Sequence, residues 1–119
     1  SFGHAIEKYF KSKIYHGIAV AHGMDISNYI SFKLNYMTEK QYLKSHNKLK
    51  KIFKRKLRNI NINKYFKILQ QDKKNTSGNV TLILSNKPGK MFIFSTHNKS
   101  KMKIHLNNYF NKWIINIKW

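Results

Sequence analysis

The sequence has no cysteine, one proline, two arginines and four acidic residues among its 119 positions. Without cysteine, disulfides, cysteine-based zinc fingers and thiol catalysis are excluded. Four carboxylates leave few ways to build a paired-carboxylate hydrolase, and no calcium-binding loop is visible. No apolar run approaches the ~20 residues that a membrane-spanning helix needs, and the N-terminus lacks a secretory signal pattern. We therefore expect a soluble, cytoplasmic protein that forms one small domain or part of a larger one.

Positive charge is present in large excess, since Lys+Arg number 24 and the formal net charge is +20. Such an excess is typical of proteins that bind nucleic acids, so a basic helical module that contacts phosphates is an alternative function. Nearly all the cations are lysines, whereas arginine is the residue that contacts bases and phosphates in a bidentate manner. Lysine, asparagine and isoleucine supply 51 residues, a bias that an A/T-rich genome produces whatever the protein does. An anionic small molecule is therefore the favoured partner.

Apolar periodicity and turn signals predict a mainly α-helical fold with one small antiparallel β-hairpin. Thr38 and Gln41 form the pattern of a capping box, which predicts that a helix of about fifteen residues starts there. Asn86 to Lys90, with Pro88 and Gly89 inside, predicts the hairpin loop. The other predicted helices cover residues 3–10, 16–34, 63–71 and a final segment, and the predicted strands cover 80–85 and 91–96.

Three helical stripes are predicted to face the core. Gly23 lies on the first stripe, where the missing side chain would allow another helix to approach closely. The stripes consist of Ala19, Gly23, Ile26, Ile30 and Leu34; of Tyr42, Leu49, Ile52 and Phe53; and of Met102, Leu106, Tyr109, Phe110 and Trp113.

Two histidines near the N-terminus are the strongest candidates for chemistry. His4 and Glu7 are three residues apart, which places them on one helix face. His16 precedes Gly17 at the predicted start of the next helix, where the helix dipole favours the neutral imidazole that binds divalent metals. Two histidines alone do not make a catalytic zinc site, because such a site usually has three protein ligands. The remaining candidates, His46, His97 and His105, are expected to have surface or packing roles.

Asp72-Lys73-Lys74 follows a predicted helix and precedes the hairpin. Lysine side chains act as point charges that can bind a phosphate. In a chain so rich in lysine, an ordinary basic loop is the simpler interpretation of these residues taken alone.

Taken together, these segments resemble the C-terminal domain of 3-dehydroquinate synthase and the wider sugar-phosphate cyclase family. The motifs are Phe2-Gly3-His4-Ala5-Ile6-Glu7, then His16-Gly17 with Gly23-Met24, then Asp72-Lys73-Lys74 ahead of a hairpin. The resemblance covers the whole chain and implies the later part of a helical C-terminal domain, with an NAD-binding N-terminal domain absent from residues 1–119.

The resemblance also implies roles for single residues. His16 corresponds to a metal ligand of the family, and His4 corresponds to a catalytic histidine beside the substrate phosphate. Lys73, with Lys74 as its neighbour, corresponds to a phosphate-binding lysine, and Glu7 corresponds to a structural glutamate. A second histidine ligand would fall just before Ser1 and a glutamate ligand further upstream.

The chemistry implied by the resemblance is the NAD- and metal-dependent (Zn or Co) cyclisation of a seven-carbon sugar-acid phosphate to 3-dehydroquinate. Phosphate is lost in this step of the shikimate pathway towards aromatic amino acids. The implied enzyme is a cytoplasmic homodimer, and residues 1–119 alone are expected to be inactive. Ile18 stands where the family usually has an acidic residue, which leaves another sugar-phosphate cyclase, or a degenerate domain serving only in assembly, as alternatives.

Overall fold

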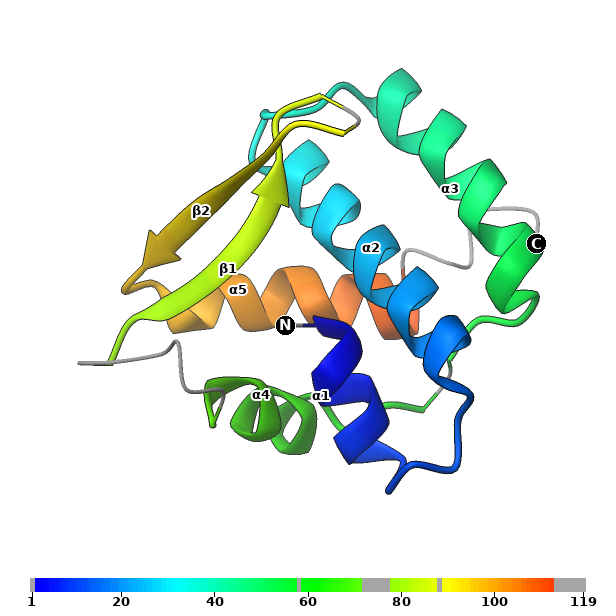
Figure 1. Ribbon diagram of the computed structural model, residues 1–119. Helices are drawn as coiled ribbons and strands as arrows, with labels where there is room; N and C mark the ends of the chain where they lie inside the picture. Colours follow the sequence, from blue (N-terminus) through cyan, green and yellow to red (C-terminus); the bar gives the residue numbers. More distant parts are fainter. Residues whose placement is uncertain (1, 58, 72–77, 88, 113–119) are drawn as a thin grey trace.

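The computed structural model describes residues 2–57, 59–71, 78–87 and 89–112. This part of the chain is mainly α-helical with one antiparallel hairpin, as the sequence predicts (Figure 1). The elements in chain order are α1 (Phe2–Tyr9), α2 (His16–Lys33), α3 (Glu39–Phe53), α4 (Ile62–Gln70), β1 (Val80–Ser85), β2 (Met91–Thr96), α5 (Lys99–Asn107) and the π-helical turn η1 (Asn108–Lys112).

Polar side chains set where three of these helices begin. The Thr38 hydroxyl accepts a hydrogen bond from the Gln41 backbone N–H, and the Gln41 side chain accepts one from the Thr38 N–H. This is the predicted capping box, which satisfies two backbone donors that a helix start leaves without partners. The Asn61 and Asn98 side chains cap α4 and α5 by accepting from the backbone N–H groups of Lys64 and Lys101.

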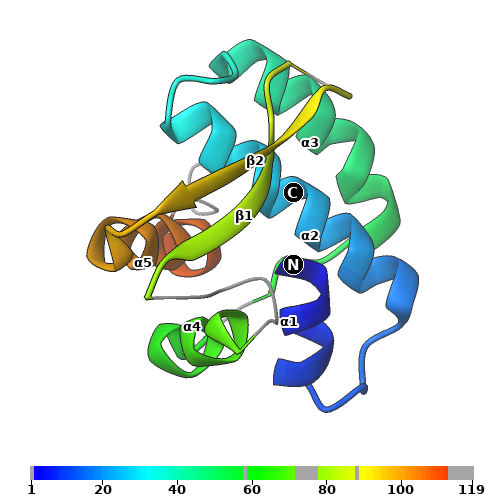
Figure 2. The ribbon, with the colours of Figure 1, turned by 60° about the vertical axis from the view of Figure 1, so that its left-hand side comes forward.

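Helix α2 lies at the centre of the fold and contacts α1, α3, β1 and α5. Figures 1 and 2 show α3 running along one side of α2, with α1 beside the N-terminal half of α2 and the hairpin crossing its other end. Because α2 has neighbours on several sides, most residues from Ala19 to Ser31 are buried. The predicted stripe residues Ala19, Ile26 and Ile30 are all fully buried.

Helices α1 and α2 approach each other through glycine. A Cβ atom added to Gly23 would lie 2.6 Å from the backbone N of Gly3, and one added to Gly3 would lie 2.9 Å from the carbonyl O of Ala19. Both distances are shorter than carbon can tolerate against backbone atoms. The close approach predicted at Gly23 is therefore confirmed, and its partner is the first turn of α1.

The hairpin has the predicted bounds and a regular antiparallel register. Val80 pairs with Thr96 at one end, and Ser85 pairs with Met91 at the other. Lys87 and Gly89 adopt left-handed backbone conformations, with φ of 71° and 86°, in the loop between the strands. Val80, Leu82 and Leu84 point inward from β1 and are buried, whereas Met91 and Ile93 on β2 are exposed.

Serine hydroxyls of α2 fasten β1 to the central helix. Ser27 Oγ donates to the carbonyl of Ile83 at 2.6 Å. Ser31 Oγ donates to the carbonyl of Ser27 at 2.7 Å and accepts from the backbone N–H of Ser85 at 2.9 Å. Backbone groups of β1 that do not pair with β2 thus find partners on α2, which fixes the strand against the helix.

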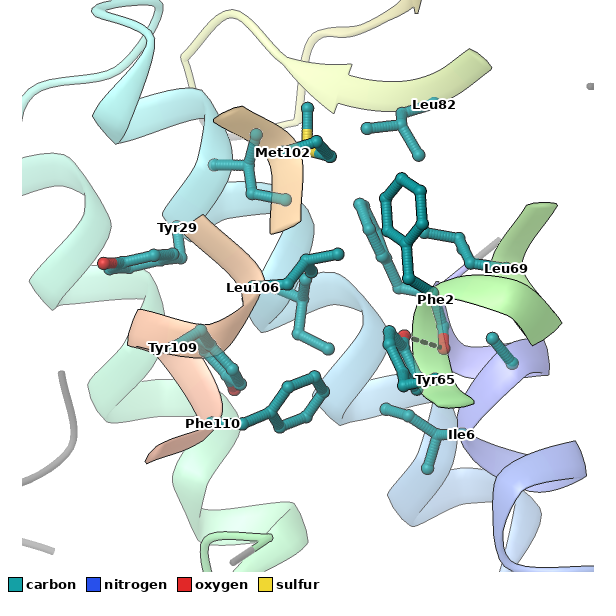
Figure 3. Close-up of a cluster of buried hydrophobic side chains, with 14 of the residues drawn as sticks. Phe2, Ile6, Tyr29, Tyr65, Leu69, Leu82, Met102, Leu106, Tyr109 and Phe110 are labelled. Atoms are coloured by element: carbon teal, nitrogen blue, oxygen red, sulfur yellow. Dashed lines mark hydrogen bonds between the residues drawn. The ribbon is translucent and has the colours of Figure 1, made fainter. Parts of the chain in front are cut away.

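One apolar cluster joins the helices and the hairpin (Figure 3). The hydroxyl of Tyr65 on α4 donates to the carbonyl of Phe2 at 2.9 Å, which ties the start of α1 into this cluster. Burying one large apolar side chain contributes about 1.5–3 kcal/mol relative to leaving it exposed. The side chains labelled in the figure are Phe2, Ile6, Tyr29, Tyr65, Leu69, Leu82, Met102, Leu106, Tyr109 and Phe110.

Two details differ from the predicted stripes. Ile52 is 53% exposed, so its assignment to the core face of α3 is wrong, and the stripe runs instead through Tyr42, His46, Leu49 and Phe53. After α5 the helix continues as the wider π-helical turn η1. Both Tyr109 and Phe110 in this turn are buried. Trp113, the last predicted member of its stripe, lies outside the described residues.

Candidate functional site

A cavity of about 360 Å³ lies between α1, α2 and the hairpin. Its walls are mostly apolar, and its titratable groups come from the two N-terminal helices, since His4 and Glu7 lie on α1 and His16 starts α2. The other lining residues are Phe2, Gly3, Val20, Gly23, Met24, Ser27, Thr81, Leu82, Ile83 and Met91. The sequence motifs that suggest chemistry at the N-terminus thus meet in one place.

His16 and Glu7 form a direct contact in this cavity. Nδ1 of His16 lies 2.9 Å from Oε1 of Glu7, and their side chains are 77% and 24% exposed. A carboxylate only accepts hydrogen bonds, so this contact leaves Nε2 as the ring nitrogen available to a ligand. Glu7 was predicted to be a structural glutamate, and the structure gives it this specific partner.

His4 is exposed and lines the same cavity as His16 and Glu7. The cavity thus brings together His4, Glu7 and His16, three of the residues singled out in the sequence. Lys73 and Lys74 lie outside the described residues. Strand β1 follows them in the sequence, and its residues Thr81, Leu82 and Ile83 form part of the cavity wall.

Ile18, at the position where the resemblance implies an acidic residue, does not line the cavity. It packs instead against the small cluster of Ala21, Leu49 and Phe53, where α2 meets α3. The apolar side chain at position 18 therefore takes part in helix packing. The carboxylate that contacts His16 comes from α1.

The histidine–carboxylate contact matches how proteins hold a divalent metal. A metal-bound imidazole usually donates its second ring N–H to a carboxylate or carbonyl, which fixes the orientation of the ring. His16, backed by Glu7, fits one ligand of such an ion. Among the residues that the structure describes, no group of three or more His, Cys, Asp or Glu side chains could hold a metal, so these residues fit only part of a ligand set.

A second histidine–carboxylate contact lies in the interior and was not predicted. Nδ1 of His46 lies 2.9 Å from Oδ2 of Asp25, and both side chains are fully buried. The hydroxyl of Tyr109 donates to the same Oδ2 atom at 2.6 Å, and that of Tyr42 donates to it at 3.3 Å. We call these four residues the buried polar cluster; it joins α2, α3 and η1.

Burial changes the protonation of the side chains around this cluster. Burial, with the Asp25 carboxylate as a smaller cause, holds the pKa of Tyr109 well above its usual value, so its hydroxyl stays a hydrogen-bond donor. His22 stacks on Phe53, with ring centroids 4.1 Å apart. Burial lowers the pKa of His22 to about 4. His22 is therefore neutral at physiological pH.

Sequence comparison bears directly on these motifs. Residues 1–75 match the family described as 3-dehydroquinate synthase C-terminal, and this match covers more than half of the chain. The chain belongs to this family. The resemblance carried by the histidine–glycine motifs is confirmed, and the mainly helical fold with its hairpin is consistent with a 3-dehydroquinate synthase C-terminal domain.

Curated proteins named 3-dehydroquinate synthase are similar to the chain. The protein from Picrophilus torridus is 33% identical over 110 residues, which cover 87% of this chain and 31% of that protein. The protein from Helicobacter pylori strain G27 is 38% identical over 88 residues, which cover 71% and 25%. The one from Macrococcus caseolyticus is 34% identical over 84 residues, which cover 71% and 22%. The chain thus spans a third or less of the length of these 3-dehydroquinate synthases.

No solved structure matches the chain significantly. Within the described ranges, none of the helices has the length and apolar character needed to cross a membrane.

What sequence reasoning missed is the buried polar cluster, although one signal was available. Asp25 is one of only four acidic residues, and it lies within the mostly buried stretch of α2.

Proposed function

We propose that the chain is the metal- and phosphate-binding part of a 3-dehydroquinate synthase. The complete enzyme would cyclise a seven-carbon sugar-acid phosphate to 3-dehydroquinate with loss of phosphate, in the shikimate pathway. It would use NAD and a divalent metal (Zn or Co), act in the cytoplasm as a homodimer, and include an NAD-binding N-terminal domain. The observation that carries the proposal is the contact between His16 and Glu7 in the same cavity as His4.

Each of the candidate site residues of this chain would have a part in that chemistry. Nε2 of His16 is the nitrogen that would hold the metal, while Glu7 accepts the Nδ1–H hydrogen bond. His4 and Lys73, with Lys74 beside it, would bind the substrate phosphate through charge-assisted hydrogen bonds, which are stronger than neutral ones. When bound, NAD supplies reversible hydride transfer and the metal polarises a substrate oxygen.

Residues 1–119 on their own are expected to be inactive and to bind zinc weakly. Among the described residues no group of three or more His, Cys, Asp or Glu side chains could hold a metal, and a catalytic zinc usually has three protein ligands. No glycine-rich phosphate loop of the dinucleotide-binding type occurs in the sequence. Sub-micromolar zinc affinity at His16 in this chain alone would contradict this expectation.

The test is steady-state kinetics of the full-length enzyme that contains this chain. His16→Ala should lower kcat by at least about a thousandfold, because it removes a metal ligand. Lys73→Ala should mainly raise KM for the phosphorylated substrate, with a smaller loss of kcat as phosphate leaves. His97→Ala and Lys48→Ala, which change exposed residues far from these motifs in the sequence, are the matched controls.

The same assay separates the alternatives. Turnover of a different sugar phosphate in preference to the seven-carbon sugar-acid phosphate would identify another cyclase of the superfamily. A folded full-length protein with no turnover of any sugar phosphate would indicate a domain that serves only in assembly. Wild-type kinetics in His16→Ala would remove His16 from the site, and wild-type kinetics in Lys73→Ala would remove Lys73.

A further inference from the structure

Glu7 does more in this cavity than support the fold. We propose that Glu7 is a positioning residue that keeps the proton of the neutral His16 ring on Nδ1, so that Nε2 is the nitrogen presented to a divalent metal. The inference rests on the proposed function in one respect, which is the role of His16 as a metal ligand.

The chemistry of the contact carries this inference. A neutral imidazole has one N–H, and its position decides which nitrogen can donate electrons to a metal. Oε1 of Glu7 lies 2.9 Å from Nδ1, and an ionised carboxylate can only accept. The contact is therefore a hydrogen bond only when Nδ1 carries the proton. Without Glu7, the described residues offer no other carboxylate along the cavity wall to favour either nitrogen.

The backbone fixes the geometry of the contact. Glu7 and His16 lie on different helices, nine residues apart in the sequence. The two helices meet where Gly3 packs against Ala19 and Gly23, without side chains between them. The start of α1 is also tied to α4 by the hydrogen bond between Tyr65 and Phe2. The carboxylate is thus held against the ring by packed backbone, as a positioning residue requires.

The first experiment measures the tautomer of His16 directly in the metal-free 119-residue chain. Nitrogen-15 NMR at alkaline pH, where the imidazole is neutral, should show the proton on Nδ1 of His16. Glu7→Ala should shift a large part of the population to the Nε2–H form. Glu7→Gln should largely keep the Nδ1–H form, because its side-chain carbonyl still accepts. Glu39→Ala, which removes an exposed carboxylate on α3, is the matched control and should change nothing.

The second experiment adds Zn²⁺ to the full-length enzyme that contains this chain, with the same substitutions, and follows the His16 ring nitrogens. Glu7→Ala should weaken zinc binding at Nε2 by about tenfold to a hundredfold, the usual effect of removing a group that orients a ligand. Glu7→Gln, which keeps the acceptor and loses the charge, should lie between Glu7→Ala and the wild type. Glu39→Ala should bind as the wild type does.

The two readouts separate the inference from the proposed function. A wild-type ring protonated mainly on Nε2, or an unchanged tautomer in Glu7→Ala, would overturn the role of Glu7 whatever the activity of the enzyme. Zinc that leaves the His16 nitrogens of the wild-type full-length enzyme unchanged would overturn His16 as a ligand, and with it the proposed function. An unchanged zinc affinity in Glu7→Ala, with the tautomer shifted, would show that Glu7 does not prepare His16 for metal.

Discussion

The described part of the chain contains two histidine–carboxylate contacts of the same length and of opposite character. In each, Nδ1 of the histidine lies 2.9 Å from a carboxylate oxygen. Glu7–His16 stands at the wall of an open cavity, with the histidine 77% exposed, whereas Asp25–His46 is fully buried and shares its carboxylate with two tyrosines. The same type of contact thus lies at an open cavity in one place and joins three elements in the interior in the other.

The largest expected effect comes from breaking the buried contact. Asp25→Ala should lower the free energy of unfolding by about 3–5 kcal/mol, because it leaves the buried partners of a charge without their acceptor. Urea denaturation followed by circular dichroism measures this change. Asp25→Asn keeps the shape of the side chain and one acceptor oxygen, and should lower the free energy of unfolding by less. A loss below about 1 kcal/mol in Asp25→Ala would mean that the cluster does not hold α2, α3 and η1 together.

Acid should destabilise the interior through His22, which lies on α2 beside the buried contact. The pKa of His22 is about 4 in the folded state and 6.5 in the unfolded state. Between these values the unfolded chain binds more protons, so stability is full above about pH 6.5 and falls as the pH drops towards 4. This shift in the pKa of His22 corresponds to a loss of about 3 kcal/mol in the free energy of unfolding.

His22→Leu removes this contribution and should flatten the pH dependence of the urea midpoint between pH 7 and 4. His97→Leu, at an exposed position, is the control and should keep the slope of the wild type. An equal slope in His22→Leu and the wild type would show that other groups cause the acid sensitivity.

Gly23→Ala tests the exposed contact through the backbone that supports it. The added Cβ would lie 2.6 Å from the backbone N of Gly3, so α1 has to move away from α2. We expect a loss of about 1–3 kcal/mol in unfolding free energy, the usual cost of overpacking. Gly17→Ala meets nothing within 4 Å and should leave stability unchanged or raise it by up to about 1 kcal/mol. Equal stabilities of the two variants would contradict the close approach of the helices.

The smallest effect is expected from the exposed contact itself. Glu7→Ala should change the unfolding free energy by no more than about 1 kcal/mol, because the hydrogen bond to an exposed histidine replaces hydrogen bonds to water and the side chains lose entropy to form it. The same urea titration serves as the measurement. A loss as large as that of Asp25→Ala would remove the contrast between the two contacts and would make Glu7 a structural residue.

Local sequence signals were sufficient for the secondary structure. The hairpin strands have the predicted bounds, and the capping box at Thr38 and Gln41 starts α3 where expected. Gly23 could be assigned to a close helix approach because only glycine fits there. In each case the residues that decide the structure lie close together in the sequence, so the pattern can be read directly.

The site was predictable only in part. The motifs around His4 and His16 indicated two residues of the cavity, but the bond between Glu7 and His16 depends on how α1 packs against α2. The buried polar cluster joins Asp25 to residues 21 and 84 positions further along the chain. Contacts of that separation come from tertiary packing and leave no periodic signal. The π-helical turn that brings Tyr109 to Asp25 leaves no such signal either.

The meeting of Gly3 and Gly23 has a consequence for how this chain can tolerate mutation. Main-chain atoms are in close contact where the two N-terminal helices meet, so substitutions on the outer faces of the helices leave this contact in place. Lysines can accumulate around the molecule through mutational bias while the distance between Glu7 and His16 stays constant. A single substitution that gives either of the two glycines a side chain would disturb that distance.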